Sequence, residues 1–285
     1  MRPHQWVKNV FVLAPLFFAK DLFEPRLFLR AAGAFGVFCI LAGAVYTIND
    51  IADADADRKH PVKRFRPIAS GRISAQSARV LAVVLVALGL GGAAYGPLPF
   101  FLVALLYFLQ NLAYSFKLKH IAYLDVAIIA TGFVLRVVGG GYGTHVHVSG
   151  YLIVCTALLA LFLGFGKRRH ELAVSAARAK EQRAALSGYT ATGLDVALGV
   201  TGIATVGTYL AYTLDSDTRA YFGSDKLFLT TIFVVLAVLR FLHLVRSRPH
   251  AESPTQEMLR DGPFVAAVLV WVGVVIYIVY NLRPS

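Results

Sequence analysis

Apolar residues lie along the chain in long runs separated by short polar segments. A run of roughly 17–25 apolar residues can cross a bilayer as a helix, and helices packed inside a bundle can be shorter. The pattern therefore predicts an all-α, polytopic membrane helix bundle with about nine transmembrane helices. The first run is short and is expected to lie partly in the membrane interface. The predicted spans are residues 9–19, 31–48, 80–95, 98–115, 122–142, 150–166, 192–213, 227–245 and 263–282.

The composition agrees with a membrane protein. Of the 285 residues, 57% are hydrophobic and 15% charged, with a mean hydropathy of +0.64. The net charge of +12 suggests nucleic acid, but the bases lie between apolar spans, so no nucleic-acid partner is expected. Cys39 and Cys155 lie inside apolar runs and predict neither a disulfide nor a thiolate metal site. We expect one transmembrane domain, residues 1–285, with polar cap loops at about 50–76 and 167–190, the second helical over 173–186.

The basic residues are distributed unevenly between the two sides of the predicted bundle. With alternating spans, 21 of the 28 Lys and Arg residues fall on the side of the N-terminus and six on the other. Because cytoplasmic loops are enriched in bases, this predicts a multi-pass protein of the inner (plasma) membrane with the N-terminus and both cap loops in the cytoplasm. The remaining base, Arg136, lies within a span.

An acidic segment follows the second span. At about 100° per residue, Asp50, Asp53 and Asp57 share one helical face, whereas Asp55 points away. Three carboxylates on one face repel each other, so a cation is expected among them. Oxygen ligands favour Mg²⁺, with Mn²⁺ as a second candidate, and Mg²⁺ keeps positions open for substrate phosphates. The alternative is a solvated acidic helix end without a ligand.

Basic residues close to this acidic face predict an anionic substrate. Arg58, Lys63 and Arg66 follow the aspartates and could hold phosphate oxygens that the metal leaves unbound. Alternatively, these bases are only anchors that obey the positive-inside rule. Together, carboxylates, metal and arginines at the mouth of a membrane helix indicate a diphosphate site.

Two other span ends carry bases on the same predicted side. Lys8 and Asn9 open the first span, and Lys117 and Lys119 end the fourth. We expect these residues to bind anionic groups, although interfacial anchoring and topology would also explain the bases.

Asp125 and Arg136 are charged residues in the fifth span, where charges are costly. Asp125 is expected either to pair with a neighbouring base or to belong to the site. Arg136 is a candidate for substrate binding, and its alternative is a structural bond to a carbonyl or a carboxylate. The glycines around Arg136 would let other helices or a lipid chain approach closely.

The sixth span ends in the segment Lys167-Arg168-Arg169-His170-Glu171. The three bases are expected to bind substrate, and inside anchoring is the alternative. Glu171 could supply a metal ligand or hold one of the bases.

The residues resemble the UbiA superfamily of intramembrane prenyltransferases. Asn49-Asp50-x-x-Asp53-x-x-x-Asp57 matches its first aspartate-rich motif, but the second such motif is replaced by the basic segment after the sixth span. The chain is more similar to the decaprenyl-phosphate phosphoribosyltransferase branch. Five segments carry this likeness: Arg2-Pro3-x-Gln5-Trp6-x-Lys8-Asn9, His60-Pro61-x-Lys63-Arg64-x-Arg66-Pro67-Ile68-Ala69-Ser70-Gly71, Tyr114-Ser115-x-x-Leu118-Lys119, Gly132-Phe133-x-Leu135-Arg136 and Gly166-Lys167-Arg168.

The resemblance implies a Mg²⁺-dependent transfer of 5-phosphoribose from 5-phosphoribosyl 1-diphosphate to a polyprenyl phosphate, with a role in supplying arabinose donors for a cell envelope. Asn49 and Tyr114 belong to the matching segments and are expected to bind substrate. Asp125 or Asp57 is expected to offset positive charge on the ribose ring. The sequence permits a homo-oligomer without specifying one.

Two other functions remain open at this point. Prenyl transfer from a polyprenyl diphosphate to an aromatic or other acceptor would need a second aspartate pair, which the sequence lacks after the sixth span. A transporter would need charges along a path through the bundle, whereas here they gather on one side.

Overall fold

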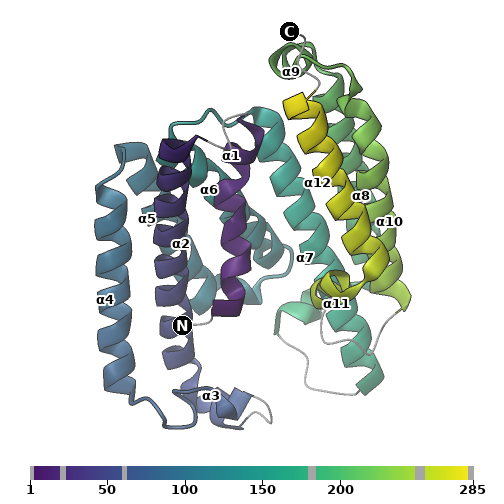
Figure 1. Ribbon diagram of the computed structural model, residues 1–285. Helices are drawn as coiled ribbons and strands as arrows, with labels where there is room; N and C mark the ends of the chain where they lie inside the picture. Colours follow the sequence, from purple (N-terminus) through teal and green to yellow (C-terminus); the bar gives the residue numbers. More distant parts are fainter. Residues whose placement is uncertain (1–2, 20–23, 60–62, 179–183, 248–253, 282–285) are drawn as a thin grey trace. The chain divides into compact units, whose positions relative to one another are not determined.

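The structure is a computed structural model that describes residues 3–19, 24–59, 63–178, 184–247 and 254–281. Within these ranges the chain is helical and has no β-strand, which confirms the all-α prediction. Figure 1 labels the α-helices. The elements follow in this order: η1 (Pro3–Leu13), α1 (Ala14–Phe18), α2 (Pro25–Ala52), α3 (Ala54–Lys59), η2 (Lys63–Phe65), α4 (Ala75–Ala94), α5 (Leu98–Phe116), η3 (Leu118–His120), α6 (Leu124–Thr144), α7 (Gly150–Arg178), η4 (Ala184–Gly188), α8 (Ala191–Leu214), α9 (Ser216–Phe222), η5 (Lys226–Thr230), α10 (Thr231–Ser247), α11 (Pro254–Arg260) and α12 (Gly262–Asn281).

Eight helices among the described residues are long and apolar enough to cross a membrane. The first predicted span corresponds to a shorter apolar stretch, Trp6–Phe18, so the expected count of about nine is consistent with the structure. Helix α2 begins at Pro25, earlier than predicted, because Glu24 caps it and its carboxylate accepts the N–H of Leu27 at 2.7 Å. Helix α7 continues past residue 166 to Arg178 instead of ending with the apolar run.

The predicted cap loops are only partly described. The first contains residues 60–62 and the second residues 179–183, which lie outside the described residues. A separate helix over 173–186 was expected. Its first part instead continues α7 through Arg178, and residues 184–188 form the short 3-10 helix η4.

The chain divides into two compact units. Unit 1 comprises residues 1–117 and 132–148, and unit 2 comprises residues 118–131 and 149–285. In unit 1, α2 packs against α4, α5 and η1 around a core that includes Phe38, Leu41 and Tyr107. In unit 2, α7 packs against α8 and α10 around Phe162 and Phe241. The expectation of one transmembrane domain stays a prediction.

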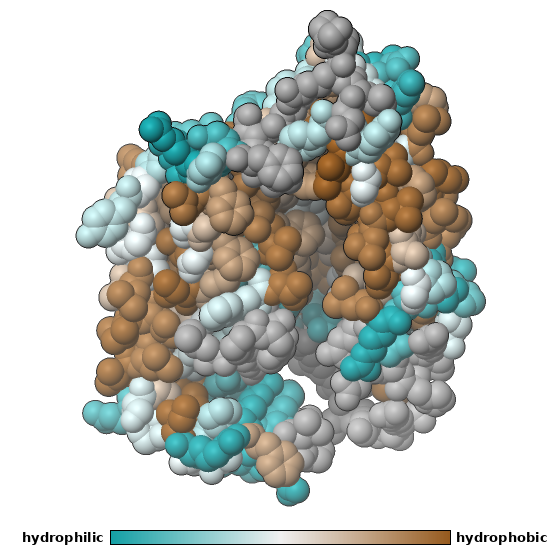
Figure 2. Space-filling model, in the orientation of Figure 1, coloured by the Kyte–Doolittle hydropathy of each residue, from teal (hydrophilic) through white to brown (hydrophobic). Residues whose placement is uncertain are grey.

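Many large apolar side chains are exposed on the outer surface of the helices. On α4, for example, Val80, Val83 and Leu88 are exposed, at 58%, 68% and 58%. Figure 2 shows brown, hydrophobic surface along the helices of each unit and teal, hydrophilic surface near helix ends such as α3. Large apolar faces of this kind are expected where lipid replaces water around the protein.

Candidate active site

The aspartates of unit 1 lie where α2 passes into α3. Asp53 ends α2, and its N–H still donates to Asn49 O at 2.9 Å, while the N–H of Asp57 donates to Asp53 O at 2.8 Å. These bonds keep the spacing of one helical turn across the break. The side chains therefore remain on the same side of the chain although two helices carry them.

Arg66 joins two of these carboxylates. Its Nη1 lies 3.3 Å from Asp50 Oδ1 and 2.5 Å from Asp57 Oδ2. The Asp50 and Asp57 side chains are 15% and 4% exposed, whereas Asp55 is 91% exposed and pairs with Arg58 at 2.6 Å. A partly buried face with Asp55 pointing away is the arrangement that the helical period predicts.

The loop after α3 is folded back by its arginines. Arg58 Nε donates to Ala69 O at 3.3 Å, and Arg72 Nη2 donates to Phe65 O at 2.6 Å. Gly71, at φ +77°, supplies the left-handed turn that this loop requires. Two of the predicted phosphate ligands, Arg58 and Arg66, are therefore held in fixed positions by the loop and the aspartates.

The donor set around Arg66 fits a hard divalent cation. In the described ranges, no group of three or more His, Cys, Asp or Glu side chains is arranged to hold a metal ion alone. Mg²⁺ is usually bound through one or two carboxylates completed by waters and substrate phosphates. The oxygens of partly buried Asp50 and buried Asp57 already stabilise one positive charge, that of Arg66. These residues thus suit a cation that arrives with a diphosphate, and the metal site stays a prediction.

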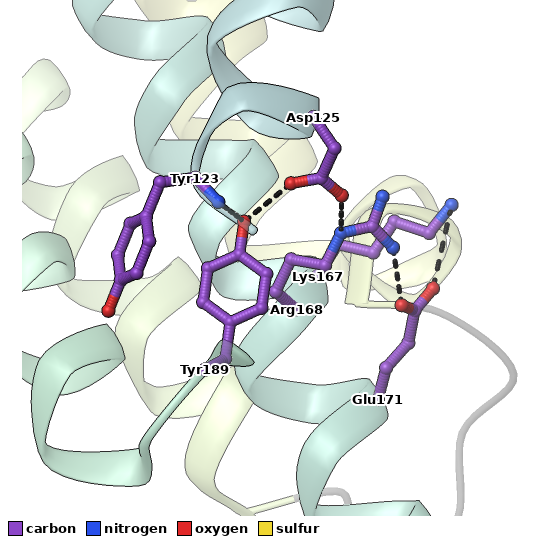
Figure 3. A network of polar contacts seen from close by, with 6 residues as sticks. All are labelled: Tyr123, Asp125, Lys167, Arg168, Glu171 and Tyr189. Atoms are coloured by element: carbon purple, nitrogen blue, oxygen red, sulfur yellow. Dashed lines mark hydrogen bonds and ion pairs between the residues drawn. The ribbon is translucent and has the colours of Figure 1, made fainter. Parts of the chain in front are cut away.

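Unit 2 contains a buried ion-pair network, drawn in Figure 3. Asp125, at the start of α6, is completely buried, and its Oδ2 lies 2.8 Å from Arg168 Nε. Its Oδ1 accepts the hydroxyl proton of Tyr189 at 2.5 Å. Of the two alternatives for Asp125, the structure shows pairing with a neighbouring base. Each of its two oxygens has a contact within the protein.

Glu171 completes this network one turn along α7. Its Oε2 accepts from Arg168 Nη1 at 2.5 Å, and its Oε1 lies 3.9 Å from Lys167 Nζ. Glu171 therefore holds bases, which was one of its two predicted roles. The Arg168 side chain is 3% exposed and lies between two carboxylates, whereas Lys167 is 48% exposed. Lys167 is thus better placed than Arg168 to contact a ligand.

Other arginines of unit 2 also pair with aspartates of neighbouring helices. Arg169 Nε lies 2.9 Å from Asp195 Oδ1 and links α7 to α8. Arg240 Nη2 lies 2.8 Å from Asp261 Oδ2 and links α10 to the start of α12, where Asp261 also caps the helix by accepting the N–H of Phe264. Much of the basic segment is therefore neutralised within the fold.

Tyr189 fixes the backbone at the start of α6. Its hydroxyl accepts the N–H of Tyr123 at 2.7 Å while donating to Asp125, and the two tyrosine rings lie 4.6 Å apart. Tyr123 has φ +65°, a conformation that is costly for a residue with a side chain. Burial, and then the bond to Asp125, raise the pKa of Tyr189 well above its ordinary value of 10.0.

Tyr189→Phe is expected to lower the free energy of unfolding by about 1–3 kcal/mol, because the substitution removes the hydrogen-bond partner of buried Asp125 Oδ1 and of the Tyr123 N–H. Since the pKa is higher in the folded state, the contribution of Tyr189 is complete below about pH 10 and declines as the pH rises further. Denaturant titration in detergent at several pH values would measure both effects. Tyr95→Phe, at a side chain 96% exposed, is the control. If the loss of stability in Tyr189→Phe stayed the same above pH 10, the stabilising role given to the Tyr189 hydroxyl would be wrong.

Arg136 lies in a second buried centre, in unit 1. Its Nε donates to Asn9 Oδ1 at 2.8 Å, its Nη1 to Gly132 O at 2.8 Å and its Nη2 to Tyr107 OH at 2.7 Å. Asn9 is completely buried, and its Nδ2 donates to Cys39 Sγ at 3.1 Å. The structure thus shows the carbonyl bond that was the alternative to substrate binding by Arg136.

The other predicted substrate ligands lie at helix ends. In unit 1, Lys8 and Lys117 are exposed and Tyr114 is half-buried. Lys63 is exposed on η2, and Lys119 of unit 2 is half-buried. Their roles stay predictions.

Sequence reasoning missed the partners of the buried charges. Four of these partners were not predicted as site residues: Tyr107, Tyr189, Asp195 and Asp261. They contact Arg136, Asp125, Arg169 and Arg240, respectively. A usable signal existed for the two aspartates, because carboxylates near the ends of apolar runs require a base nearby. The two tyrosines carried no such signal.

Comparison with known proteins identifies the family. The model of the UbiA prenyltransferase family matches residues 9–258, which is most of the chain. This chain belongs to the UbiA prenyltransferase family. Decaprenyl-phosphate phosphoribosyltransferase of Corynebacterium glutamicum is 34% identical to this UbiA-family chain over 284 residues, which cover 98% of the chain and 85% of that protein. The protein of the same name from Mycobacterium tuberculosis is 34% identical over 281 residues, covering 96% and 91%.

Solved structures agree with the family assignment. A UbiA homolog from Archaeoglobus fulgidus bound to DMAPP and Mg²⁺ matches with a TM-score of 0.68 at 18% identity, covering 99% of this chain and 98% of that one. This likeness shows the fold. The chain is accordingly a multi-pass membrane transferase of the UbiA family.

Proposed function

We propose that this UbiA-family enzyme transfers 5-phosphoribose from 5-phosphoribosyl 1-diphosphate to a polyprenyl phosphate and releases diphosphate. The observation that carries the proposal is the 34% identity, over nearly the whole chain, to enzymes named decaprenyl-phosphate phosphoribosyltransferase. The basic segment at the end of α7 supports it. An ordinary UbiA enzyme is expected to carry a second aspartate pair there, and bases suit a donor with an additional phosphate.

Asp50, Asp53 and Asp57 are proposed to hold a divalent cation, Mg²⁺ or Mn²⁺, together with the donor diphosphate. When bound, the cation neutralises charge on the diphosphate and makes it a better leaving group. Arg66, which lies between Asp50 and Asp57, is positioned to donate to a diphosphate oxygen from the same place. Arg58 and Lys63 are proposed to contact the same group.

The bond changes follow from the charges of the two substrates. The bond from the anomeric carbon to the diphosphate oxygen breaks, and its electron pair leaves with the diphosphate. An oxygen of the polyprenyl phosphate forms the new bond from the opposite face. This oxygen is already anionic at neutral pH, so no side chain has to remove a proton.

Asp125 is proposed to be a positioning residue instead of a group that stabilises the ribose. Its Oδ2 forms an ion pair with Arg168, its Oδ1 accepts a hydrogen bond from Tyr189, and its side chain is fully buried. Asp57 is left as the carboxylate that could offset positive charge on the ring. Among the remaining bases, Lys8 and Lys167 are exposed and are proposed to bind phosphate groups.

The reaction is proposed to occur at the cytoplasmic face of the inner (plasma) membrane, where the soluble donor is available. The basic segments favour this side. The lipid product would then serve the synthesis of arabinose donors for a cell envelope, as the resemblance implies.

Purified protein, labelled 5-phosphoribosyl 1-diphosphate, decaprenyl phosphate and Mg²⁺ test this proposal directly. We expect a labelled lipid that retains its 5-phosphate and is absent when EDTA is added. Restoring Mg²⁺ in excess over EDTA should restore the product. A parallel reaction contains a prenyl diphosphate and an aromatic acceptor. Product only in that reaction would overturn the proposal in favour of prenyl transfer, and donor uptake into proteoliposomes without chemical change would favour a transporter.

A further inference from the structure

We propose that Arg136 is a positioning residue that fixes the register of the N-terminal helix η1 and thereby orients Lys8. The proposal concerns unit 1 only. Its link to substrate rests on the proposed function, in which Lys8 binds a phosphate group.

The first observation is the unusual environment of Arg136. The residue is 6% exposed, and its bonded acceptors are three neutral oxygens, from Asn9, Gly132 and Tyr107. Within the part of the chain that the structure describes, no carboxylate pairs with it. The guanidinium also lies over the rings of Tyr107 and Phe133, at 4.6 and 5.4 Å. A buried charge without a counter-charge is stabilised only by its neutral hydrogen-bond partners, so losing any one of them is costly. The bond to Asn9 is therefore expected to be strong.

The second observation is the form of η1 itself. This 3-10 helix has 11 residues, whereas 3-10 runs longer than about four are uncommon. With three residues per turn, every third residue lies on the same face. Asn9 and Val12 are 0% and 1% exposed and Trp6 is half-buried, whereas Val7 and Val10 are 60% and 51% exposed. The buried face of η1 thus follows the 3-10 period.

The third observation is a second contact between η1 and α6. A Cβ atom on Gly140 would lie 1.9 Å from Val12 O, so the backbone of η1 touches α6 there. Arg136 and Gly140 are four residues apart and share a face of α6, while Asn9 and Val12 share a face of η1. The two helices therefore meet at two matched points, Arg136 with Asn9 and Gly140 with Val12.

These two points specify the 3-10 register. In an α-helix, which turns about 100° per residue instead of about 120°, Val12 would rotate by about 60° relative to Asn9. One of the two contacts would then be lost. Lys8 is adjacent to Asn9 and exposed, so its direction depends on the same register. Arg136 acts on Lys8 through Asn9 and need not touch the substrate.

Alkylation of Cys39 tests the register without an activity assay. Cys39 is 4% exposed and accepts the bond from Asn9 Nδ2. With the other cysteine removed by Cys155→Ala, N-ethylmaleimide should label Cys39 slowly. Arg136→Met and Asn9→Leu should each raise the labelling rate at least about 10-fold, because each removes the hydrogen bond between Arg136 and Asn9. Asn9→Asp keeps an acceptor for Arg136 and should stay closer to the parent protein than Asn9→Leu.

The matched control is Arg79→Met, at an exposed arginine on α4 of the same unit. Unchanged Cys39 labelling in Arg136→Met would overturn the proposed register. A variant that fails to fold would also label quickly at Cys39, so Asn9→Asp, which retains the acceptor for Arg136, decides that case. If Asn9→Asp also labels as fast as Asn9→Leu, the bond to Arg136 does not hold η1.

Kinetics test the link to Lys8. In the phosphoribosyl assay, Lys8→Met and Arg136→Lys should both raise the KM for the anionic donor more than they lower kcat, and the double variant should add little to either. A KM unaffected by Lys8→Met, with faster Cys39 labelling in Arg136→Met, would overturn the link to substrate and leave the register intact. Absence of any phosphoribosyl product from the parent protein would overturn the proposed function, and the labelling result would still decide the register.

Discussion

Asp57→Asn is expected to reduce metal-dependent turnover by about 10³-fold while leaving the protein folded. The substitution removes one of the two carboxylates that stabilise the charge of Arg66 and, in the proposed function, part of the cation site. Loss of charge stabilisation worth several kcal/mol corresponds to a change of this size. Initial rates over a range of Mg²⁺ concentrations would show whether the loss is in metal affinity, in kcat or in both.

Asp55→Asn is the matched control, because Asp55 lies two residues away and its side chain is 91% exposed. This variant should keep nearly the parental rate. Equal loss in the two variants would indicate that general negative charge near α3 matters instead of a specific site. Parental activity in Asp57→Asn would remove the acidic face from the mechanism.

Gly140→Ala is expected to destabilise unit 1 by about 3 kcal/mol, at the upper end of the cost of overpacking. The new Cβ would lie 1.9 Å from Val12 O and 2.8 Å from Val12 C, and backbone cannot move aside as a flexible side chain does. η1 would have to leave α6. A lower thermal midpoint in detergent, with faster proteolysis of the N-terminal segment, would measure the effect.

Gly36→Ala, on α2, is the matched control and is not expected to destabilise the protein. Nothing lies within 4 Å of a Cβ placed at Gly36, and alanine favours a helix by about 1 kcal/mol over glycine. The same chemical change should therefore be neutral or stabilising there. If both variants were equally stable, the close approach of η1 to α6 would be wrong.

The acidic face was predictable because its order is local. Asp50, Asp53 and Asp57 follow a helical period that the sequence shows directly, and the break at Asp53 does not disturb it. The spans were predictable for a similar reason, since hydropathy depends on neighbours in sequence. The end of α7 was not, because the apolar run marks where the membrane ends and the helix continues beyond it to Arg178.

The partners of the buried charges could not be derived in this way. Arg136 contacts Asn9 across 127 positions, and Tyr189 contacts Asp125 across 64. Such pairs depend on how helices pack, and a neutral asparagine or tyrosine carries no charge that marks it as a partner. The sequence therefore indicated that Asp125 and Arg136 needed partners, but only the structure identified them.

The ion pairs of unit 2 also weaken the long-range attraction that the arginines exert on an anionic substrate. Arg168, Arg169 and Arg240 each lie within 3 Å of an aspartate from another segment, at 2.8, 2.9 and 2.8 Å. Paired charges of opposite sign produce a field that fades quickly, so these arginines contribute little to the attraction of an approaching anion. The rate at which a phosphorylated donor associates should consequently depend on ionic strength less steeply than the 28 Lys and Arg residues alone would suggest.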